Sequence, residues 1–294
     1  MANRTWIGTG AAPNDWTHPD NWSPTGVPTG GMHVYFEDSS VDCNTVSELN
    51  QSGVDLGSLN IDQSYTGSLG AAGTPLQSQT PILNIGYHNG PGTPSGSPLI
   101  NIDLGNDDTA ITVSNTGTSV DASKAPVRLK GSGSNTLVVS KGKVSFGTDT
   151  DDTTSVLTTL TVTYDTKVST DADVFIGSGV ALTTANLFGG GTVYECDCSA
   201  TTIYAGTLLT AGVWAGATTL AAYGGTATVN STGTITTCSI YGGTVDFTKT
   251  VGAKTITNMF LAKGGILKFN STGTTLSGGI LSLDVGQNTT YTAS

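Results

Sequence analysis

The sequence predicts an all-β protein, a parallel β-helix (β-solenoid) with a Trp- and Pro-rich cap at its N-terminal end. Three observations predict this fold. The composition is rich in Gly and Thr and poor in charge, a degenerate repeat of about twenty residues fills the C-terminal third, and the opening segment is aromatic. Each observation corresponds to a physical requirement of stacked coils of β-strands.

The composition excludes several structural classes. Of the 294 residues only 11% are charged, less than half of the roughly 25% typical of soluble domains. Coiled coils and highly charged disordered segments need far more charge. The 40 glycines fall at irregular intervals, which excludes collagen. About fifty threonines favour strands, because a β-branched side chain packs well on a pleated surface.

A repeat punctuated by glycine occupies the C-terminal third. Its glycine runs end at Gly191, Gly206, Gly225, Gly243 and Gly265, in steps of 15, 19, 18 and 22 residues. Short strands repeated at this interval are typical of solenoids, in which each coil buries its face only against its neighbours. Glycine suits the corners because it adopts positive φ and allows close backbone approach. An ordinary sandwich with Gly turns is the alternative.

Alternating apolar and polar residues follow these glycines and indicate half-buried strands. In one of them Val245 and Phe247 are expected to point inward while Asp246 faces water. Residues 46–51 could form a single helical turn. Further strands are expected upstream, at residues 56–61, 81–85, 99–104, 110–114, 127–129, 136–140, 143–146, 157–164 and 173–176.

The first fifty residues differ from the rest. Trp6, Trp16 and Trp22 lie here among four prolines. Because the end coil of a solenoid has no neighbour to cover it, a bulky cap is needed, and Trp buries a large area. We therefore expect a cap or attachment segment at 1–50, irregular solenoid turns at 51–171 and regular ones at 172–294. A platform of exposed Trp that binds carbohydrate is the alternative for the first segment.

Charge and cysteine content restrict the partners and the compartment. A net charge of −11 argues against nucleic acid and membrane, since both polyanions recruit Lys and Arg. No stretch resembles a secretion signal or a membrane span, so synthesis in the cytoplasm is expected. The four cysteines are too few and too dispersed for a disulfide scaffold, and we expect free, buried thiols.

The repeats lack the pattern that catalysis needs. Glycoside hydrolysis uses two carboxylates at a defined separation, whereas the few acids between residues 180 and 285 share no common register. Cys196 and Cys198, with Cys238 further along, are expected to be stacked core thiols rather than zinc ligands. We therefore expect no enzyme activity, no catalytic residue, no cofactor and no metal.

Two acidic turns are the remaining candidates for a metal. They resemble the oxygen-rich loops that hold calcium, but solvated turns are the favoured interpretation, because Asp favours turns through its own backbone hydrogen bonds. The residues are Asp103, Asp107 and Asp108 in one turn and Asp149, Asp151 and Asp152 in the other.

The N-terminal motif resembles a known group of sequences. It consists of Trp6-Ile7-Gly8, Asn14-Asp15-Trp16, Asp20-Asn21-Trp22, Gly26-Val27-Pro28 and Val34-Tyr35-Phe36. This pattern is similar to a Trp-rich motif at the start of autotransporter-like β-helices. The following segments, 56–61 and 65–70, resemble structural proteins of tailed bacteriophages. The resemblance implies a virion protein that decorates or cements a phage head.

The expected function is therefore that of a non-enzymatic structural protein of the capsid surface. Its expected partners are the major capsid protein and itself, as a homotrimer. Attachment through the cap is assigned to Trp6, Trp16, Trp22, Tyr35 and Phe36. The first alternative is a receptor-binding fibre or adhesin that recognises glycans, and the second is a polysaccharide depolymerase. A glycan site is assigned to Trp214, Tyr223 and Tyr241.

Overall fold

The protein is nearly all β, and the predicted parallel β-helix is confirmed. The computed structural model describes residues 2–71, 73–86, 100–114, 127–148, 154–163, 173–210, 217–230, 232–248, 253–269, 274–283 and 290–293. Apart from strands it contains two single-turn 3-10 helices, η1 (Pro19–Asn21) and η2 (Val46–Glu48). The second one lies within the predicted helical turn at 46–51.

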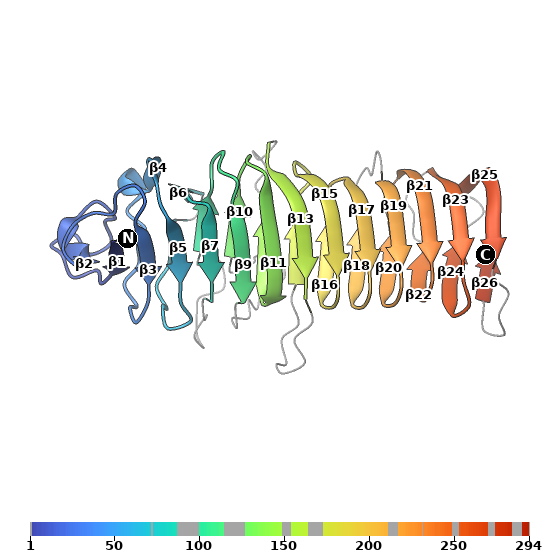
Figure 1. Ribbon diagram of the computed structural model, residues 1–294, viewed down its shortest axis with the longest axis horizontal. Coiled ribbons are helices and arrows are strands. Elements are labelled where there is room, and N and C mark those ends of the chain that lie inside the picture. Colours follow the sequence, from blue (N-terminus) through green and yellow to red (C-terminus); the bar gives the residue numbers. More distant parts are fainter. Residues whose placement is uncertain are drawn as a thin grey trace. The chain divides into compact units, whose positions relative to one another are not determined.

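The chain forms two compact units. Unit 1 comprises Met1–Thr148 with Thr154–Val156, and unit 2 comprises Asp149–Thr153 with Leu157–Ser294. Neighbouring strands of one sheet lie side by side in each unit (Figure 1). The boundaries expected from the sequence at residues 50 and 171 stay predictions.

Unit 1 contains two sheets, in which every strand pair except β1 with β2 is parallel. Sheet A of unit 1 has the order β2 (Trp22–Ser23), β1 (Asn3–Trp6), β3 (His33–Phe36), β5 (Ser58–Ile61), β7 (Ile82–Ile85), β9 (Ala110–Ser114) and β11 (Asn135–Lys141). Sheet B of unit 1 has the order β4 (Asn50–Asp55), β6 (Leu76–Gln79), β8 (Ile100–Asp103), β10 (Val127–Lys130) and β12 (Lys143–Phe146).

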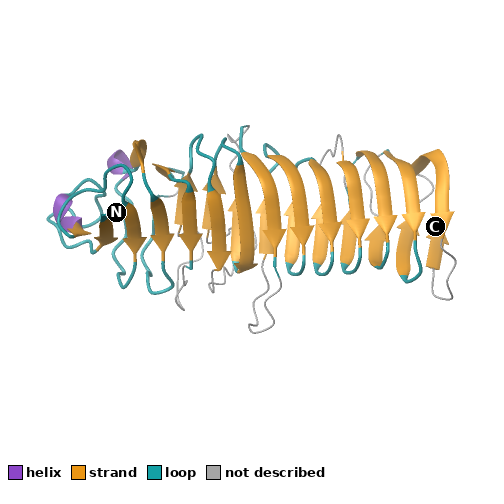
Figure 2. Cartoon of the chain, viewed as in Figure 1, coloured by secondary structure: helices purple, strands orange, loops and turns teal. Residues whose placement is uncertain are grey.

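Unit 2 repeats one coil, a sheet A strand followed by a corner and a sheet B strand, and short loops form the corners from β15 to β24 (Figure 2). Sheet A of unit 2 has the order β13 (Val156–Val162), β15 (Ala181–Leu187), β17 (Cys198–Ile203), β19 (Ala217–Ala222), β21 (Gly233–Ile240), β23 (Lys254–Leu261) and β25 (Thr274–Leu283). Sheet B of unit 2 has the order β14 (Asp173–Ile176), β16 (Gly191–Tyr194), β18 (Thr207–Thr210), β20 (Thr226–Val229), β22 (Gly243–Asp246), β24 (Gly265–Phe269) and β26 (Thr290–Ala293).

The core of unit 2 consists of columns of equivalent residues. Register pairs place one buried side chain of each coil against its counterpart in the next coil. On sheet A the column contains Leu187, Ile203, Ala222, Ile240 and Leu261, each at most 1% exposed. Each coil thus buries apolar area that an isolated coil would leave in water.

The corner glycines explain the repeat. Gly206, Gly225 and Gly243 have φ of 81°, 67° and 70°, in the left-handed region that favours glycine. The residue after each corner donates its N–H to the corner one coil earlier, as from Thr226 to the Gly206 carbonyl at 2.9 Å. A Cβ on Gly225 would lie 2.5 Å from that same carbonyl oxygen. The corner therefore requires glycine for both its conformation and its close approach.

Most of the predicted strands are confirmed. Residues 110–114, 143–146 and 173–176 coincide with β9, β12 and β14, and the other six upstream strands differ by one or two residues at one or both ends; residues 99 and 164 lie outside the described residues. In the first repeat the positive-φ corner is Gly190, one residue before the last glycine of the run.

One predicted orientation is wrong. Asp246 does not face water but is 9% exposed. Its carboxylate accepts hydrogen bonds from the Thr248 N–H at 2.8 Å and the Thr248 hydroxyl at 2.6 Å, and the Lys268 ammonium lies 3.8 Å away. These groups satisfy the hydrogen-bonding needs of the Asp246 carboxylate, so it can be buried at the end of β22.

Gly225→Ala is expected to lower the free energy of unfolding by about 2–4 kcal/mol, because it adds left-handed strain and a backbone clash. Chemical denaturation of both proteins measures the difference. The matched control is Gly53→Ala, where φ is not positive and no atom lies within 4 Å of the place that the added Cβ would take. The control is expected to stay within about 0.5 kcal/mol of the wild type. Equal effects of the two substitutions would contradict the role of the corner.

Candidate functional site

The predicted cap contains a cluster of buried aromatic rings in unit 1. Trp6 ends β1, Trp22 begins β2, Phe36 ends β3, and Trp16 lies in the loop between β1 and η1. The ring centroids of Trp6 and Trp22 are 5.0 Å apart, and those of Trp16 and Trp22 are 4.8 Å apart, both edge-to-face. The Phe36 ring lies 5.6, 6.0 and 5.9 Å from Trp6, Trp16 and Trp22. These four side chains form a single apolar core.

The indole N–H and hydroxyl groups of the cluster form hydrogen bonds with the backbone of the surrounding loops. The Trp6 indole N–H donates to the Val41 carbonyl at 3.0 Å, and the Trp22 indole N–H donates to the Trp16 carbonyl at 2.7 Å. The Tyr65 hydroxyl lies 3.0 Å from the same Val41 carbonyl, and its ring is 5.1 Å from that of Phe36. The cluster therefore holds the loops of the cap as well as its strands.

Burial decides what these aromatic residues can touch. Trp6, Trp16, Trp22 and Phe36 are at most 1% exposed, so the alternative of an exposed Trp platform is wrong. Tyr35 is half-buried. Attachment to a capsid through this segment stays a prediction, and a partner would meet the loops that the cluster supports. Sequence reasoning missed Val46, a lone apolar residue that is 58% exposed on η2.

An exposed row of stacked aromatic rings, here called the aromatic ladder, runs along unit 2. Its members are Phe188, Tyr204, Tyr223 and Tyr241, which are 41, 44, 51 and 42% exposed. Successive centroids are 4.6, 5.3 and 4.7 Å apart, with interplanar angles of 1°, 10° and 13°. Each ring occupies the residue after a sheet A strand, so the coil register places one ring on the next.

The ladder bears on the predicted glycan site. It contains Tyr223 and Tyr241, and it adds Phe188 and Tyr204, which stand at the same place in the repeat. Tyr223 has a ring on each face, and Tyr241 lies between Tyr223 and Phe260, whose centroid is 5.4 Å away. Ring edges and hydroxyls are therefore presented outward rather than ring faces. Trp214 lies outside the described residues, and glycan binding here stays a prediction.

The carboxylates of the first acidic turn bind groups of their own turn and of the next coil. Asp103 accepts a hydrogen bond from the Gly105 N–H at 2.9 Å and lies 3.5 Å from the Lys130 ammonium. Asp108 accepts one from the Ser134 N–H at 2.6 Å. Burial, with Asp55 and Asp108 nearby, raises the pKa of Asp107. The second turn, with Asp149, Asp151 and Asp152, lies outside the described residues.

The four cysteines are free and buried, as predicted. Burial raises the pKa of Cys196 and Cys238 to about 12 and that of Cys198 to about 11, and it also raises the pKa of Cys43. The Thr201 hydroxyl donates to the Cys198 sulfur at 3.3 Å. Cys196 lies in the turn before β17, whereas Cys198 begins that strand. Among the described residues no group of three or more His, Cys, Asp or Glu is arranged to hold a metal.

Lys254 is a buried cation that sequence reasoning missed. It begins β23, opposite Gly233 and Thr274, and it is 1% exposed. Burial disfavours the charged form and lowers the pKa of Lys254 to about 8. No periodic signal in the sequence marks this lysine as an inward residue.

The comparisons with known proteins add no relative. No protein-family model, curated protein or solved structure matches the chain. Within the part of the chain that the structure describes, no helix is long and apolar enough to cross a membrane.

The thiols are expected to resist modification in the folded protein. A thiolate is the reacting species, and burial both raises the pKa and blocks access. At pH 8, Ellman's reagent is expected to titrate less than one thiol per folded chain and all four in guanidinium chloride. Rapid titration of two or more thiols in the folded protein would contradict their burial.

Lys254→Met is expected to gain about 1–3 kcal/mol of stability over the wild type as the pH falls from 10.5 to 7, because burial lowers the pKa of Lys254 and the variant lacks this titrating group. The unfolded chain keeps this proton up to about pH 10.5, whereas the folded chain loses it near pH 8. Between these values the unfolded state binds more protons, so wild-type stability rises with pH and the advantage of the variant disappears.

Denaturant unfolding at several pH values measures this difference. The control is Lys263→Met, at an exposed turn position, which is expected to change stability by less than about 0.5 kcal/mol throughout. An advantage of Lys254→Met that stays constant from pH 7 to pH 10.5 would contradict the assignment.

Proposed function

We propose that the protein is a non-enzymatic structural component of a virus particle, one that decorates or cements a phage capsid. The observation that supports this most is the register of unit 2. From β15 to β22, successive coils repeat the same buried column, the same glycine corner and the same outward aromatic ring. A stack of this kind transmits load through packed side chains and backbone hydrogen bonds, which suits a scaffold.

The N-terminal sequence supports the placement on a particle. The motif that resembles autotransporter-like β-helices contributes Trp6, Trp16, Trp22 and Phe36, which together build the cap, and the segments 56–61 and 65–70 that follow it resemble structural proteins of tailed bacteriophages. A cap held by one apolar cluster presents its loops rigidly, and rigid loops lose little conformational entropy on binding. We therefore propose the cap as the segment that meets the major capsid protein.

A homotrimer is the proposed state of the chain on the particle. Solenoids with apolar outward faces associate side by side, and cyclic symmetry closes such contacts. Ile82 on β7, which is 42% exposed, is an apolar residue on the outward face of sheet A. Light scattering that returned the mass of a monomer would contradict the trimer.

A receptor-binding fibre or adhesin is the second candidate. The observation that favours it is the aromatic ladder, because exposed aromatic residues in a row often mark a recognition surface. A depolymerase is the third and least favoured candidate, since the acids of the repeats share no common register in the sequence.

The position of the protein on particles tests the proposal. Density-purified particles of the virus that encodes the chain are analysed by quantitative mass spectrometry and by immunogold electron microscopy. The chain is expected at a fixed ratio to the major capsid protein, with gold on the head. Absence from the particles would overturn the proposal, and gold confined to the tail would favour the fibre.

Add-back to particles that lack the chain tests the cap. Val46→Arg places a charge on an apolar residue that is 58% exposed in the cap, and it is expected to weaken rebinding at least tenfold. The control is Val138→Arg on β11, 37% exposed and outside the cap. Equal rebinding of the two variants would remove the cap from the interface.

A further inference from the structure

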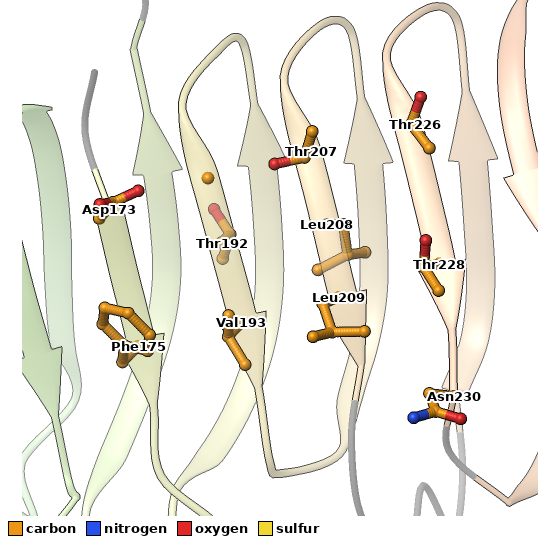
Figure 3. A pocket seen from close by; sticks show the side chains of 11 residues that line it. Asp173, Phe175, Thr192, Val193, Thr207, Leu208, Leu209, Thr226, Thr228 and Asn230 are labelled. Atoms are coloured by element: carbon orange, nitrogen blue, oxygen red, sulfur yellow. The ribbon is translucent and has the colours of Figure 1, made fainter. Parts of the chain in front are cut away.

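Unit 2 carries a shallow groove on the outward face of its sheet B. Its volume is about 470 Å³, and its walls come from β14, β16, β18 and β20 (Figure 3). Four adjacent strands at ~4.8 Å spacing make it roughly 14 Å long. This length suits a chain molecule of a few linked rings.

The coil register divides the floor of the groove into two rows. In the first row Phe175, Val193, Leu209 and Thr228 are register partners on successive strands, so this row is mostly apolar. In the second row the partners are Asp173, Gly191, Thr207 and Thr226, so this row is polar. A ligand lying across the strands would therefore meet an apolar side and a hydroxyl-rich side at once.

Gly191 opens a gap in the polar row. A Cβ at this position would lie 2.9 Å from the Asp173 carboxylate oxygen Oδ1 and 3.6 Å from the Thr207 hydroxyl oxygen. An acceptor from one strand and a hydroxyl from another thus border the same small space. With no side chain at Gly191 to cover them, this carboxylate and this hydroxyl can both contact a ligand in the groove.

Asn230 lies at the other end of the groove, just after β20 (Figure 3). Its side-chain oxygen Oδ1 is buried and has no hydrogen-bond partner. A buried acceptor without a partner costs free energy, which a ligand donor would recover once the Asn230 side chain turned this oxygen into the groove. The groove therefore presents carboxylate, amide and hydroxyl oxygens beside aliphatic and aromatic carbon.

We propose that this groove binds a neutral oligosaccharide. Sugar rings carry hydroxyls that donate to Asp173 and Asn230 and accept from the Thr hydroxyls, and their C–H faces pack on Phe175 and Leu209. Asp173 is the one charged residue that lines the described groove, and it disfavours an anionic ligand. This site differs from the aromatic ladder, which precedes Thr207 and Thr226 by three residues on each coil.

Binding to an array of immobilised glycans tests the site. The array presents neutral glucans, mannans and galactans together with sulfated and sialylated oligosaccharides, and the full chain is the probe. At least one neutral glycan is expected to retain the protein, whereas the anionic glycans are not. Failure of every neutral glycan to bind, or binding of anionic glycans alone, overturns the proposal.

Variants locate the binding. Leu209→Arg fills the centre of the groove from a residue that is 39% exposed, and Gly191→Ala fills the gap beside Asp173. Both are expected to weaken binding at least tenfold. The matched control is Ile266→Arg on β24 of the same sheet, 37% exposed and outside the groove, which is expected to bind like the wild type. Circular dichroism confirms that each variant is folded.

Two results would assign the groove otherwise. If Leu209→Arg binds the glycan as the wild type does, the site lies elsewhere on the chain. If Leu209→Arg converts an oligomer to a monomer in light scattering while no glycan binds the wild type, the groove is a contact between copies. Neither result depends on where the protein sits on particles, so the proposed function is tested separately.

Discussion

In-register stacking of equivalent residues is the interaction on which the rest of unit 2 depends. Leu187, Ile203, Ala222 and Ile240 each pack on the residue one coil away. Because side chains alternate with a period of two, a slip of one residue would turn a whole column from the core to the solvent. Burial therefore strongly specifies the register, and the same register aligns the corners and the outward rows of successive coils.

The same constraint acts on the outside and at the end. Outward residues at equivalent positions of successive coils lie side by side, whether or not they are buried. The aromatic ladder and the two rows of the groove result from this in-register stacking. At the N-terminal end the stacking stops, because β1 has only the two-residue β2 beyond it. There Trp6, Trp16, Trp22 and Phe36 replace the missing coil with an apolar cluster of their own.

Local chemistry made much of this predictable from the sequence. The glycines at the corners and the alternation of apolar and polar residues in β14 and β24 depend on the residue type at single positions. The sequence pattern therefore reveals these features. The sheet A strands of unit 2 from β15 onward were not predicted, and in β17 and β19 the apolar alternation is weak because the inward residues include Thr201 and Ala222. As charged residues, Asp246 and Lys254 are expected from the sequence to be exposed to solvent. Their burial depends on contacts with other parts of the fold, which no single segment shows. The groove depends on four strands at once, and no single segment signals it.

The corner glycines also constrain how such a chain can change in length. The Gly206 carbonyl accepts a hydrogen bond from the Thr226 N–H, and the Gly225 carbonyl accepts one from the Thr244 N–H. An insertion within a strand or at a glycine corner would break one link of this series and shift the column there, whereas the steps of 15 to 22 residues show that the other connections of a coil vary in length. Insertion of an entire coil would preserve each link. Growth by whole units is therefore the route open to this architecture, and its length changes in discrete steps set by the backbone at each corner.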